Sequence, residues 1–276
     1  MGATRIDGNA CGAAVEAALA ERIAALPNPP HLAVVIVGDD PASHVYVGAK
    51  ERACGRLGIR STRIDIAADA EYAEVVSTVQ RLNADPDVNG ILVQSPLPSG
   101  MDEIAITDLI DPIKDVDGFH AQNLGRLVQG DASGLLPCTP AGVMRMLDWA
   151  DVDLSGKRAV VIGRSRIVGM PQSLLLAQKG ADATVTIAHS RTADMAALCR
   201  EADVIIAAVG RSNMVTSDWV KPGATVIDVG VNRVNDDSER GYHLTGDVHP
   251  DVAEVAGALS PVPGGVGPMT IAMLMS

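Results

Sequence analysis

Short apolar runs alternate with amphipathic segments along the whole chain. The apolar runs are rich in β-branched residues and predict strands at 32–38, 62–66, 90–94, 158–163, 183–189, 203–210 and 225–230. Between them, amphipathic stretches predict helices, among them 41–57, 71–84, 169–179 and 192–202. Apolar strands that alternate with helices are typical of parallel sheets covered on both faces. The pattern therefore predicts an α/β fold built on parallel sheet.

Two interruptions of this pattern indicate where the chain divides. The clearer one is QGDASGLLPCTPAG at 129–142, which is rich in Gly, Ser and Pro. It contains Thr139 followed by Pro140, a favourable helix start because threonine can cap and proline needs no amide partner. The second interruption is SPVPGGVGP at 260–268, and the short apolar tail after it predicts a helix from about Pro268.

The length of the chain supports a division into two domains. It has 276 residues, of which 47% are hydrophobic, enough for two packed cores. We predict that a second domain begins at about residue 140 and that another junction lies at 260–268. The polar stretch NDDSERG at 235–241 predicts a surface loop or a hairpin tip.

Composition and charge exclude several classes of function. The net charge of −12 repels nucleic acid, so we expect no nucleic-acid partner. No apolar stretch reaches the roughly 18 residues of a membrane span, and no export signal is recognisable, so we expect no membrane association. The four cysteines form no CxxC pair, which disfavours a zinc site and a disulfide framework. We therefore expect a cytoplasmic protein without a metal site.

The stretch VVIGRSRIVGMP at 160–171 has the form of a nucleotide-binding turn. An apolar strand ends at Gly163, a polar turn follows, and a helix is predicted to begin near Val168. Backbone amides at a helix N-terminus form an anion site, and Gly163 and Gly169 would let the turn and the helix close up. The spacing differs from GxGxxG, because Ser165 and Val168 stand where glycines would. By itself the stretch fits either a phosphate-binding loop or a tight turn.

The end of the next predicted strand favours the cofactor interpretation, and NADP in particular. An acidic residue at this place holds the ribose hydroxyls of NAD, whereas an arginine suits the 2′-phosphate of NADP. Here the strand ends in His189, Ser190 and Arg191, while Asp182 lies before the strand. With Arg164 also near the expected phosphates, the sequence predicts an NADP site.

A stripe of residues on the predicted helix at 41–57 includes a lysine. Tyr46 and Lys50 are four residues apart and share a face, which continues to Cys54 with Val47 nearby. A helical lysine is most often a solvated surface charge, but these neighbours are not typical of a wet face. A lysine in an apolar, partly desolvated site can serve as acid or base near neutral pH. Lys50 is therefore a candidate for proton transfer.

Two further polar features follow apolar segments. Gln94 ends the strand GILVQ, where it could simply cap the edge, although α/β sites are assembled at the carboxyl ends of parallel strands. The stretch KDVDGFH at 114–120 carries Asp115 and Asp117, which could belong to a turn or a metal site. No further carboxylates at calcium-loop spacing accompany them, so we expect no metal. A single carboxylate there could instead hold a flat amino-heterocycle by paired hydrogen bonds.

Seven motifs, taken in order, resemble one family over almost the whole chain, from about residue 5 to 275. They are YVGAK, GILVQSPLP, KDVDGFH, PCTPAG, GRSRIVGMP, VIDVGVNR with GDV, and PVPGGVGPMT. The chain is similar in them to the bifunctional methylenetetrahydrofolate dehydrogenase/methenyltetrahydrofolate cyclohydrolases. The resemblance implies a folate-binding domain of residues 1–139 with 262–276 and a Rossmann-like NADP-binding domain of residues 140–261, with a cleft between them. It implies further that GRSRIVGMP is the cofactor loop and that the protein is a homodimer joined through the cofactor domains. It also implies NADP-dependent oxidation of 5,10-methylenetetrahydrofolate and hydrolysis of the methenyl product to 10-formyltetrahydrofolate.

The resemblance implies a role for each matching residue. Lys50 is the acid/base residue of the cyclohydrolase, Gln94 hydrogen-bonds it, Tyr46 lies against the folate rings, and Asp117 binds the pterin edge. A turn with Pro263, Gly264 and Gly265 lines the cleft. The implied NADP contacts are Gly163, Arg164, Ser165, Ser190 and Val231, to which the strand end at 189–191 adds Arg191.

The chain also departs from the family pattern. The family reads YVRNK or YVKNK where this chain has Gly48 and Ala49, and leucine where it has Ser95; neither change touches the implied contacts. The family's last helix runs on past PMTIAMLM, whereas this sequence ends at Ser276.

Three other functions compete with this one. A different NADP dehydrogenase would explain the second domain, but not the presence together of Tyr46, Lys50, Gln94 and Asp117 in the first. A nucleotide-sensing module would need neither Lys50 nor Gln94. A dehydrogenase without the cyclohydrolase step is the closest rival, and an assay with the methenyl compound separates the two.

Overall fold

The computed structural model describes residues 2–238 and 241–276, which form two compact units. The three-strand unit comprises Ala14–Cys138 and Leu274–Ser276. The six-strand unit comprises the segment up to Ala13 and Thr139–Met273. Helices α1 (Gly8–Ala24) and α9 (Val266–Met275) each contribute residues to both units. Within the described ranges, no helix is both long enough and apolar enough to cross a membrane.

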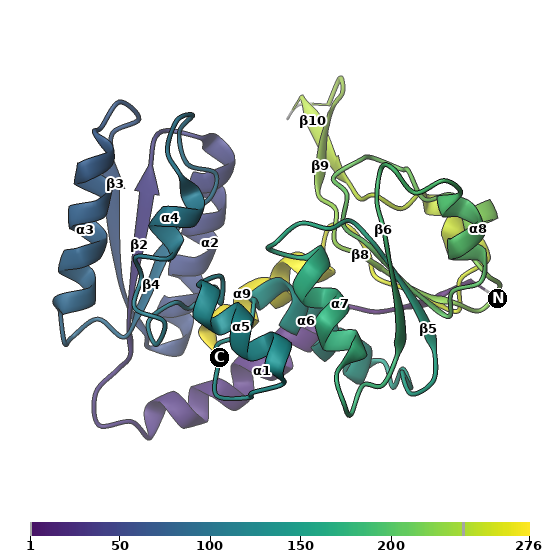
Figure 1. Cartoon of the computed structure of the whole chain (residues 1–276), viewed down its shortest axis with the longest axis horizontal. Helices are drawn as coiled ribbons and strands as arrows, with labels where there is room; N and C mark the ends of the chain where they lie inside the picture. Colours follow the sequence, from purple (N-terminus) through teal and green to yellow (C-terminus); the bar gives the residue numbers. More distant parts are fainter. Residues whose placement is uncertain (1, 239–240) are drawn as a thin grey trace. The chain divides into compact units, whose positions relative to one another are not determined.

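The three-strand unit is a parallel sheet with helices on both faces (Figure 1). Its strands lie in the order β3 (Arg60–Ile66), β2 (His31–Val37), β4 (Gly90–Val93). Alternate residues of β2, such as Val35, pack in one buried cluster with α3 (Tyr72–Ala84). The residues between them point the other way, toward α2 (Pro41–Leu57). Two short helices complete the unit, α4 (Glu103–Thr107) and α5 (Ala121–Gln129).

The six-strand unit is also a parallel sheet, and every neighbouring pair of its strands is parallel. The order is β1 (Thr4–Arg5), β11 (Ala258–Leu259), β8 (Thr225–Asp228), β7 (Val204–Ala207), β5 (Arg158–Ile162), β6 (Thr184–Ala188). The remaining elements are α6 (Cys138–Trp149), α7 (Gly169–Ala177), α8 (Met195–Arg200), the 3-10 turns η1 (Ser217–Trp219) and η2 (Pro250–Glu254), and the antiparallel pair β9 (Asn232–Asn235) and β10 (Tyr242–Thr245).

The strand order reverses at β5. From β5 the chain moves to β6 on one side and then crosses back to β7 on the other side. In open parallel sheets a ligand crevice forms outside the carboxyl ends of the strands at such a switch point. The loops after β5 and β7 therefore border the place where this sheet is expected to bind a ligand.

Every strand predicted from the apolar runs is present, and the α/β architecture is confirmed. The helices predicted at 41–57, 71–84 and 169–179 are found within two residues of those bounds, and the one at 192–202 is shorter, Met195–Arg200. The polar stretch at 235–241 joins β9 to β10, as a hairpin tip would, although residues 239–240 lie outside the described residues.

The units divide the chain differently from the predicted domains in two segments. The first residues join the six-strand unit, because Thr4 and Arg5 pair in parallel with Ala258 and Leu259. Most of the C-terminal segment, 262–273, joins it too. A two-residue edge strand shows no periodicity of its own, so its pairing is decided by contacts more than 250 positions away in the chain.

Candidate active site

Helix α2 holds a lysine against the sheet of the three-strand unit. Asp40 caps the helix, since its carboxylate accepts the N–H of Ser43 at 2.8 Å. Lys50 is only 8% exposed, and Val47 and Cys54 on the same face are fully buried. The apolar character predicted for this stripe is therefore confirmed, and the Lys50 side chain lies among core residues.

Gln94 lies at the carboxyl end of β4 and contacts this lysine. Its backbone N–H donates to the Val35 carbonyl at 2.8 Å and extends the strand pairing. Lys50 Nζ donates to Gln94 Oε1 at 3.1 Å, and Gln94 Nε2 donates to the Ser95 carbonyl at 2.6 Å. Because both ends of the amide are engaged, its oxygen is held toward the lysine. This is the pairing that the family resemblance implies.

The two aspartates of KDVDGFH have different surroundings. A parallel bridge to β4 at Asp115 adds this segment to the edge of the sheet. Asp115 is 1% exposed and accepts the His120 N–H at 2.8 Å and the Asn123 side-chain amide at 2.9 Å. Asp117 is partly buried; burial raises the pKa of its carboxyl group, and the charge of Lys50 opposes that rise. Asp115 therefore holds the loop, and Asp117 is the carboxylate in electrostatic contact with the lysine.

Two further side chains complete this region. Tyr46 lies one turn before Lys50 on α2 and is 44% exposed, so its ring is accessible to a flat ligand. Cys138 is buried, and its thiol donates to the Val116 carbonyl at 3.2 Å. Burial, and then the charge of Asp117, raise the pKa of this thiol well above its usual range. Cys138 is therefore a neutral packing group, and no local sequence signal marked it.

The loop at 163–169 is closed so tightly that two positions require glycine. Gly163 has a φ of +122°, and a Cβ there would run into the Ala208 carbonyl of the loop after β7. A Cβ at Gly169 would run into the carbonyl of Gly163 itself. The Ser165 hydroxyl accepts the N–H groups of Val168 and Gly169 at 3.2 and 3.3 Å, so it caps the start of α7. The predicted closure of this loop is confirmed, with the helix packed on the end of β5.

The turn after β6 presents no carboxylate at the end of the strand. His189 Nδ1 accepts the Arg191 N–H at 3.2 Å, and both Ser190 and Arg191 are exposed. The next acidic residue, Asp194, accepts the Ala197 N–H at 2.9 Å and caps α8. A ligand at this strand end would therefore meet a hydroxyl and a guanidinium group.

The other predicted contacts also lie in the six-strand unit. Arg164 is exposed in the loop after β5, and Val231, 45% exposed, follows β8. Pro263, Gly264 and Gly265, predicted to line the folate side of a cleft, follow β11. The structure brings Lys50, Gln94 and Asp117 together in the three-strand unit, whereas this proline–glycine turn belongs to the six-strand unit.

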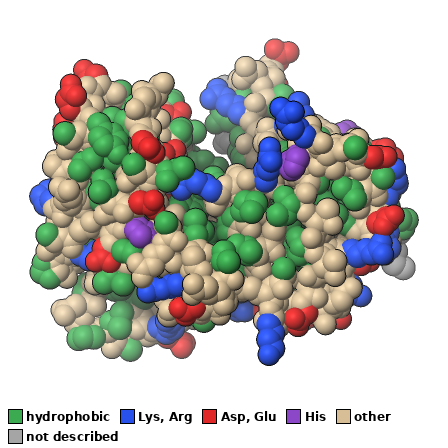
Figure 2. Space-filling view, in the orientation of Figure 1, with side chains coloured by type: hydrophobic (Ala, Val, Ile, Leu, Met, Phe, Trp, Pro, Cys, Tyr) green, Lys and Arg blue, Asp and Glu red, His purple; other side chains and the backbone are tan. Residues whose placement is uncertain are grey.

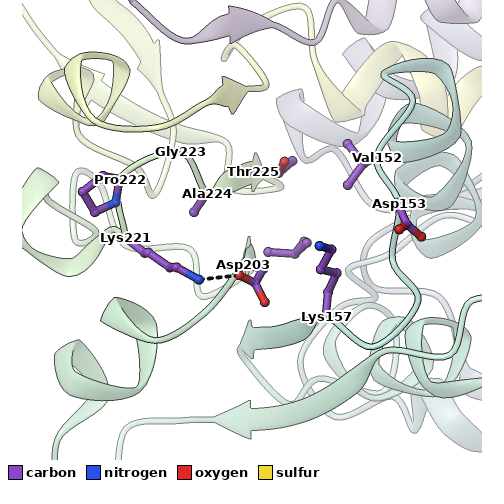
Figure 3. Close-up of a pocket in the computed structure, with 10 residues that line it drawn as sticks. Val152, Asp153, Lys157, Asp203, Lys221, Pro222, Gly223, Ala224 and Thr225 are labelled. Atoms are coloured by element: carbon purple, nitrogen blue, oxygen red, sulfur yellow. Dashed lines mark hydrogen bonds and ion pairs between the residues drawn. The ribbon is translucent and has the colours of Figure 1, made fainter.

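Charge and cavities add two observations. Figure 2 shows Lys and Arg side chains gathered on the drawn face of the six-strand unit, where an anionic ligand would be favoured despite the acidic net charge. A cavity of about 280 Å³ lies at the amino ends of β5, β7 and β8, with Lys221 Nζ bonded to Asp203 at 2.5 Å on its wall (Figure 3). Parallel sheets bind ligands at their carboxyl ends, so we assign this cavity no function. Within the residues that the structure describes, no three His, Cys, Asp or Glu side chains gather as a metal site would require.

Two family models match the chain along almost its whole length. Residues 6–117 match the tetrahydrofolate dehydrogenase/cyclohydrolase catalytic domain, and residues 137–276 match the NAD(P)-binding domain of the same family. The bifunctional protein FolD of Acidiphilium cryptum is 56% identical, with 100% of this chain and 96% of that protein covered. FolD 1 of Haloarcula marismortui is 51% identical, with 98% and 93% covered.

Solved structures show the same relationship. The FolD methylenetetrahydrofolate dehydrogenase/cyclohydrolase of Campylobacter jejuni is 44% identical with a TM-score of 0.94, covering 99% of this chain and 95% of that chain. The Trypanosoma brucei enzyme, solved with NADP cofactor and an inhibitor, is 38% identical with a TM-score of 0.95, covering 100% and 95%.

Proposed function

Because the chain belongs to the tetrahydrofolate dehydrogenase/cyclohydrolase family and is a bifunctional enzyme of one-carbon metabolism, we propose how its two reactions are divided among its residues. It oxidises 5,10-methylenetetrahydrofolate with NADP, and it hydrolyses the resulting methenyl cation to 10-formyltetrahydrofolate. The three-strand unit supplies the acid–base chemistry and the six-strand unit binds NADP. The observation that carries the proposal is the 3.1 Å hydrogen bond from the buried Lys50 ammonium to Gln94 at a strand end.

Lys50 is the acid/base residue of the hydrolysis in this proposal. A water molecule attacks the methenyl carbon and loses a proton, and the nitrogen that leaves this carbon gains one. One group that both accepts and returns a proton at the same place serves both needs. Gln94 supports this because its amide oxygen fixes the direction of the ammonium group while offering no proton of its own there.

Asp117 and Tyr46 bind and orient the folate. A pterin edge carries N–H donors, and a carboxylate can accept two of them. Asp115 is already occupied by the protein's own amide donors, which leaves Asp117 as the better candidate of the two. The exposed Tyr46 ring offers a flat surface one helical turn from Lys50.

The loop after β5 fits the pyrophosphate of NADP. The glycines at 163 and 169 leave no Cβ at the closest backbone approaches, so a phosphate could lie close to the backbone of this loop. Arg164, Ser190 and Arg191 are exposed near the two strand ends and would hold the 2′-phosphate, and Val231 would contact the nicotinamide side. When bound, NADP supplies the acceptor for the hydride, and the protein's task is to align the two rings.

We further propose that the enzyme is a cytoplasmic homodimer joined through its six-strand units. The family resemblance supports the dimer. The four cysteines are free and buried, which is compatible with a reducing compartment. Size-exclusion chromatography with light scattering tests the dimer, because a monomer at assay concentration would contradict it.

Absorbance assays test the two reactions directly. With 5,10-methylenetetrahydrofolate and NADP, we expect methenyl product and NADPH to form. With the methenyl compound alone, we expect its absorbance to decay faster than in buffer. If the methenyl compound decays only at the buffer rate, the enzyme is a dehydrogenase without cyclohydrolase activity. If NADPH does not form in the first assay, the dehydrogenase assignment is contradicted.

A further inference from the structure

A buried carboxylate holds the loop that follows β7. Asp247 has no exposed surface. Its Oδ2 accepts the N–H groups of Val209 and Gly210 at 2.7 and 3.0 Å, and its Oδ1 accepts the Arg211 N–H at 2.8 Å. Three consecutive backbone amides of this loop therefore point at one side chain that is 36 or more positions away in the chain.

The same carboxylate also holds the turn that follows β8. Asp247 Oδ1 accepts the Asn232 side-chain amide at 2.9 Å. A second carboxylate, Asp228 at the end of β8, accepts the N–H groups of Gly230 and Asp247 at 3.0 and 2.9 Å, and that of Val248 at 2.9 Å. The two aspartates thus tie the β7 loop, the β8 turn and the segment after β10 into one network.

The backbone is shaped to let these carboxylates in. A Cβ at Gly230 would collide with the carboxylate of Asp247, and a Cβ at Gly246 would collide with that of Asp228. Four donors contact the Asp247 carboxylate, so this buried polar group is well supplied with hydrogen bonds, as its burial requires. Burial raises the pKa of Asp228 to about 7, although the hydrogen bonds from the Asp247 and Val248 N–H groups oppose that rise.

This network lies beside the switch point of the sheet. The loops after β5 and β7 touch where Gly163 approaches the Ala208 carbonyl, one residue before the amides that Asp247 holds. Because the turn after β6 suits the adenosine phosphate and the glycine-closed loop after β5 suits the pyrophosphate, the other half of a dinucleotide extends in the opposite direction. In this strand order that direction leads over β7 and β8, whose loops the two aspartates hold.

We propose that Asp247, supported by Asp228, is a positioning residue of the dehydrogenase that fixes residues 209–211 and 230–232 in the shape that receives the nicotinamide half of NADP. This rests on the proposed function, since it presupposes NADP as the cofactor. Asp247 is buried beneath residues 209–211 and 230–232, and in this proposal it contacts neither the nicotinamide ring nor the folate rings. It acts through the backbone that it orders before the cofactor arrives, which reduces the ordering cost of binding.

The substitution Asp247→Asn tests this role. It replaces one acceptor oxygen by an NH₂ group that faces backbone N–H donors, so the loops lose part of their anchor. We expect the NADP dissociation constant, measured by calorimetry, and the KM for NADP to rise about tenfold or more. The KM for the folate and the rate of methenyl hydrolysis measured without NADP should stay within about twofold of the parent, since neither step uses these loops.

A matched control and a milder variant keep the test decisive. Asp203→Asn removes a carboxylate at the amino ends of the same strands, far from the proposed cofactor site. There Asp203 accepts the Arg158 N–H and a hydrogen bond from Lys221 Nζ. This variant should leave the NADP dissociation constant unchanged. If Asp247→Asn does not fold, Asn232→Ala decides, because it deletes only one donor, and about threefold weaker NADP binding is expected.

Two outcomes would overturn the positioning role. One is an unchanged NADP dissociation constant in the folded Asp247→Asn or, failing that, in Asn232→Ala. The other is a proportional fall of both activities with NADP affinity intact, which a general structural defect would produce. If the parent enzyme itself does not bind NADP, the proposed function fails, and this result is distinguishable because it does not involve the variants.

Discussion

The two units build their candidate sites from different materials. In the three-strand unit the functional groups are side chains. They are the buried Lys50, the Gln94 amide that accepts its hydrogen bond, and the Asp117 carboxylate, whose pKa burial raises and the charge of Lys50 lowers. In the six-strand unit the binding edge is mostly backbone, closed by glycines and anchored from beneath by Asp228 and Asp247. Proton transfer requires groups that titrate, whereas a dinucleotide requires shape and amide donors. Substitutions should therefore damage proton transfer or folate binding in one unit and NADP binding in the other.

The largest expected effect comes from removing the lysine. Lys50→Met should lower methenyl hydrolysis by about two orders of magnitude or more, the usual scale for lost acid–base help. The dehydrogenase should fall less, so methenyl product accumulates, which absorbance over time will show. Hydrolysis at the parental rate would remove Lys50 from the acid/base role. Loss of both activities together with folate binding would make it a substrate-holding residue.

A second lysine provides the control for that experiment. Lys114 donates to the carbonyls of Leu82, Asn83 and Asp85 at 3.3, 2.9 and 2.7 Å and so holds the structure of the same unit. Lys114→Met should lower the melting temperature while leaving the ratio of the two activities unchanged. A changed ratio in this variant would show that the ratio reports stability and not proton transfer.

Cofactor choice tests the six-strand unit. Charge-assisted hydrogen bonds to the 2′-phosphate contribute on the order of 1.5–3 kcal/mol, so kcat/KM should favour NADP over NAD by roughly tenfold to a hundredfold. Arg191→Ala should reduce this preference and leave methenyl hydrolysis unchanged. Equal efficiency of the parent enzyme with NAD and NADP would contradict the assignment of Ser190, Arg191 and Arg164.

The paired aspartates separate binding from structure within a single loop. Asp117→Asn should raise the KM for the folate about tenfold in both reactions and leave NADP affinity intact, since a pterin donor would meet an NH₂ group. Asp115→Asn should instead lower the stability of the protein by about 1–3 kcal/mol, because the buried His120 and Asn123 donors lose their acceptor. Kinetics and thermal melting of both variants distinguish the binding role of Asp117 from the structural role of Asp115. Normal folate binding by Asp117→Asn would make Asp117 structural as well.

The smallest effect concerns the core behind the cofactor loop. Gln172 has no exposed surface, and its Oε1 has no hydrogen-bond partner within the described part of the chain. Gln172→Met should therefore raise the unfolding free energy by about 1 kcal/mol and the melting temperature by about 2–4 °C without changing either activity. The neighbouring Ser173→Ala is the control, because its hydroxyl donates to the Gly169 carbonyl at 2.7 Å and its loss should not stabilise.

Features that depend only on neighbours in the chain can be predicted from the amino-acid sequence. The strands, the Asp40 cap, the buried stripe of α2 with Lys50, and the glycine-closed loop at 163–169 follow from periodicity, capping and steric rules acting over a few residues. The spacing of this loop fits either a phosphate-binding loop or a tight turn, whereas the strand end at 189–191 and the ordered family motifs favour a nucleotide.

The division of tasks among chemically similar side chains depends instead on contacts between distant segments of the chain. KDVDGFH offers two aspartates, and the difference between them arises because His120 and Asn123 fold back onto one. The first residues join the six-strand unit because β1 pairs with β11, and Asp247 reaches the loop after β7 because the chain returns there after β10. A sequence records local preference, but a buried polar group takes its role from the partners that distant segments bring to it, since only those satisfy its hydrogen bonds.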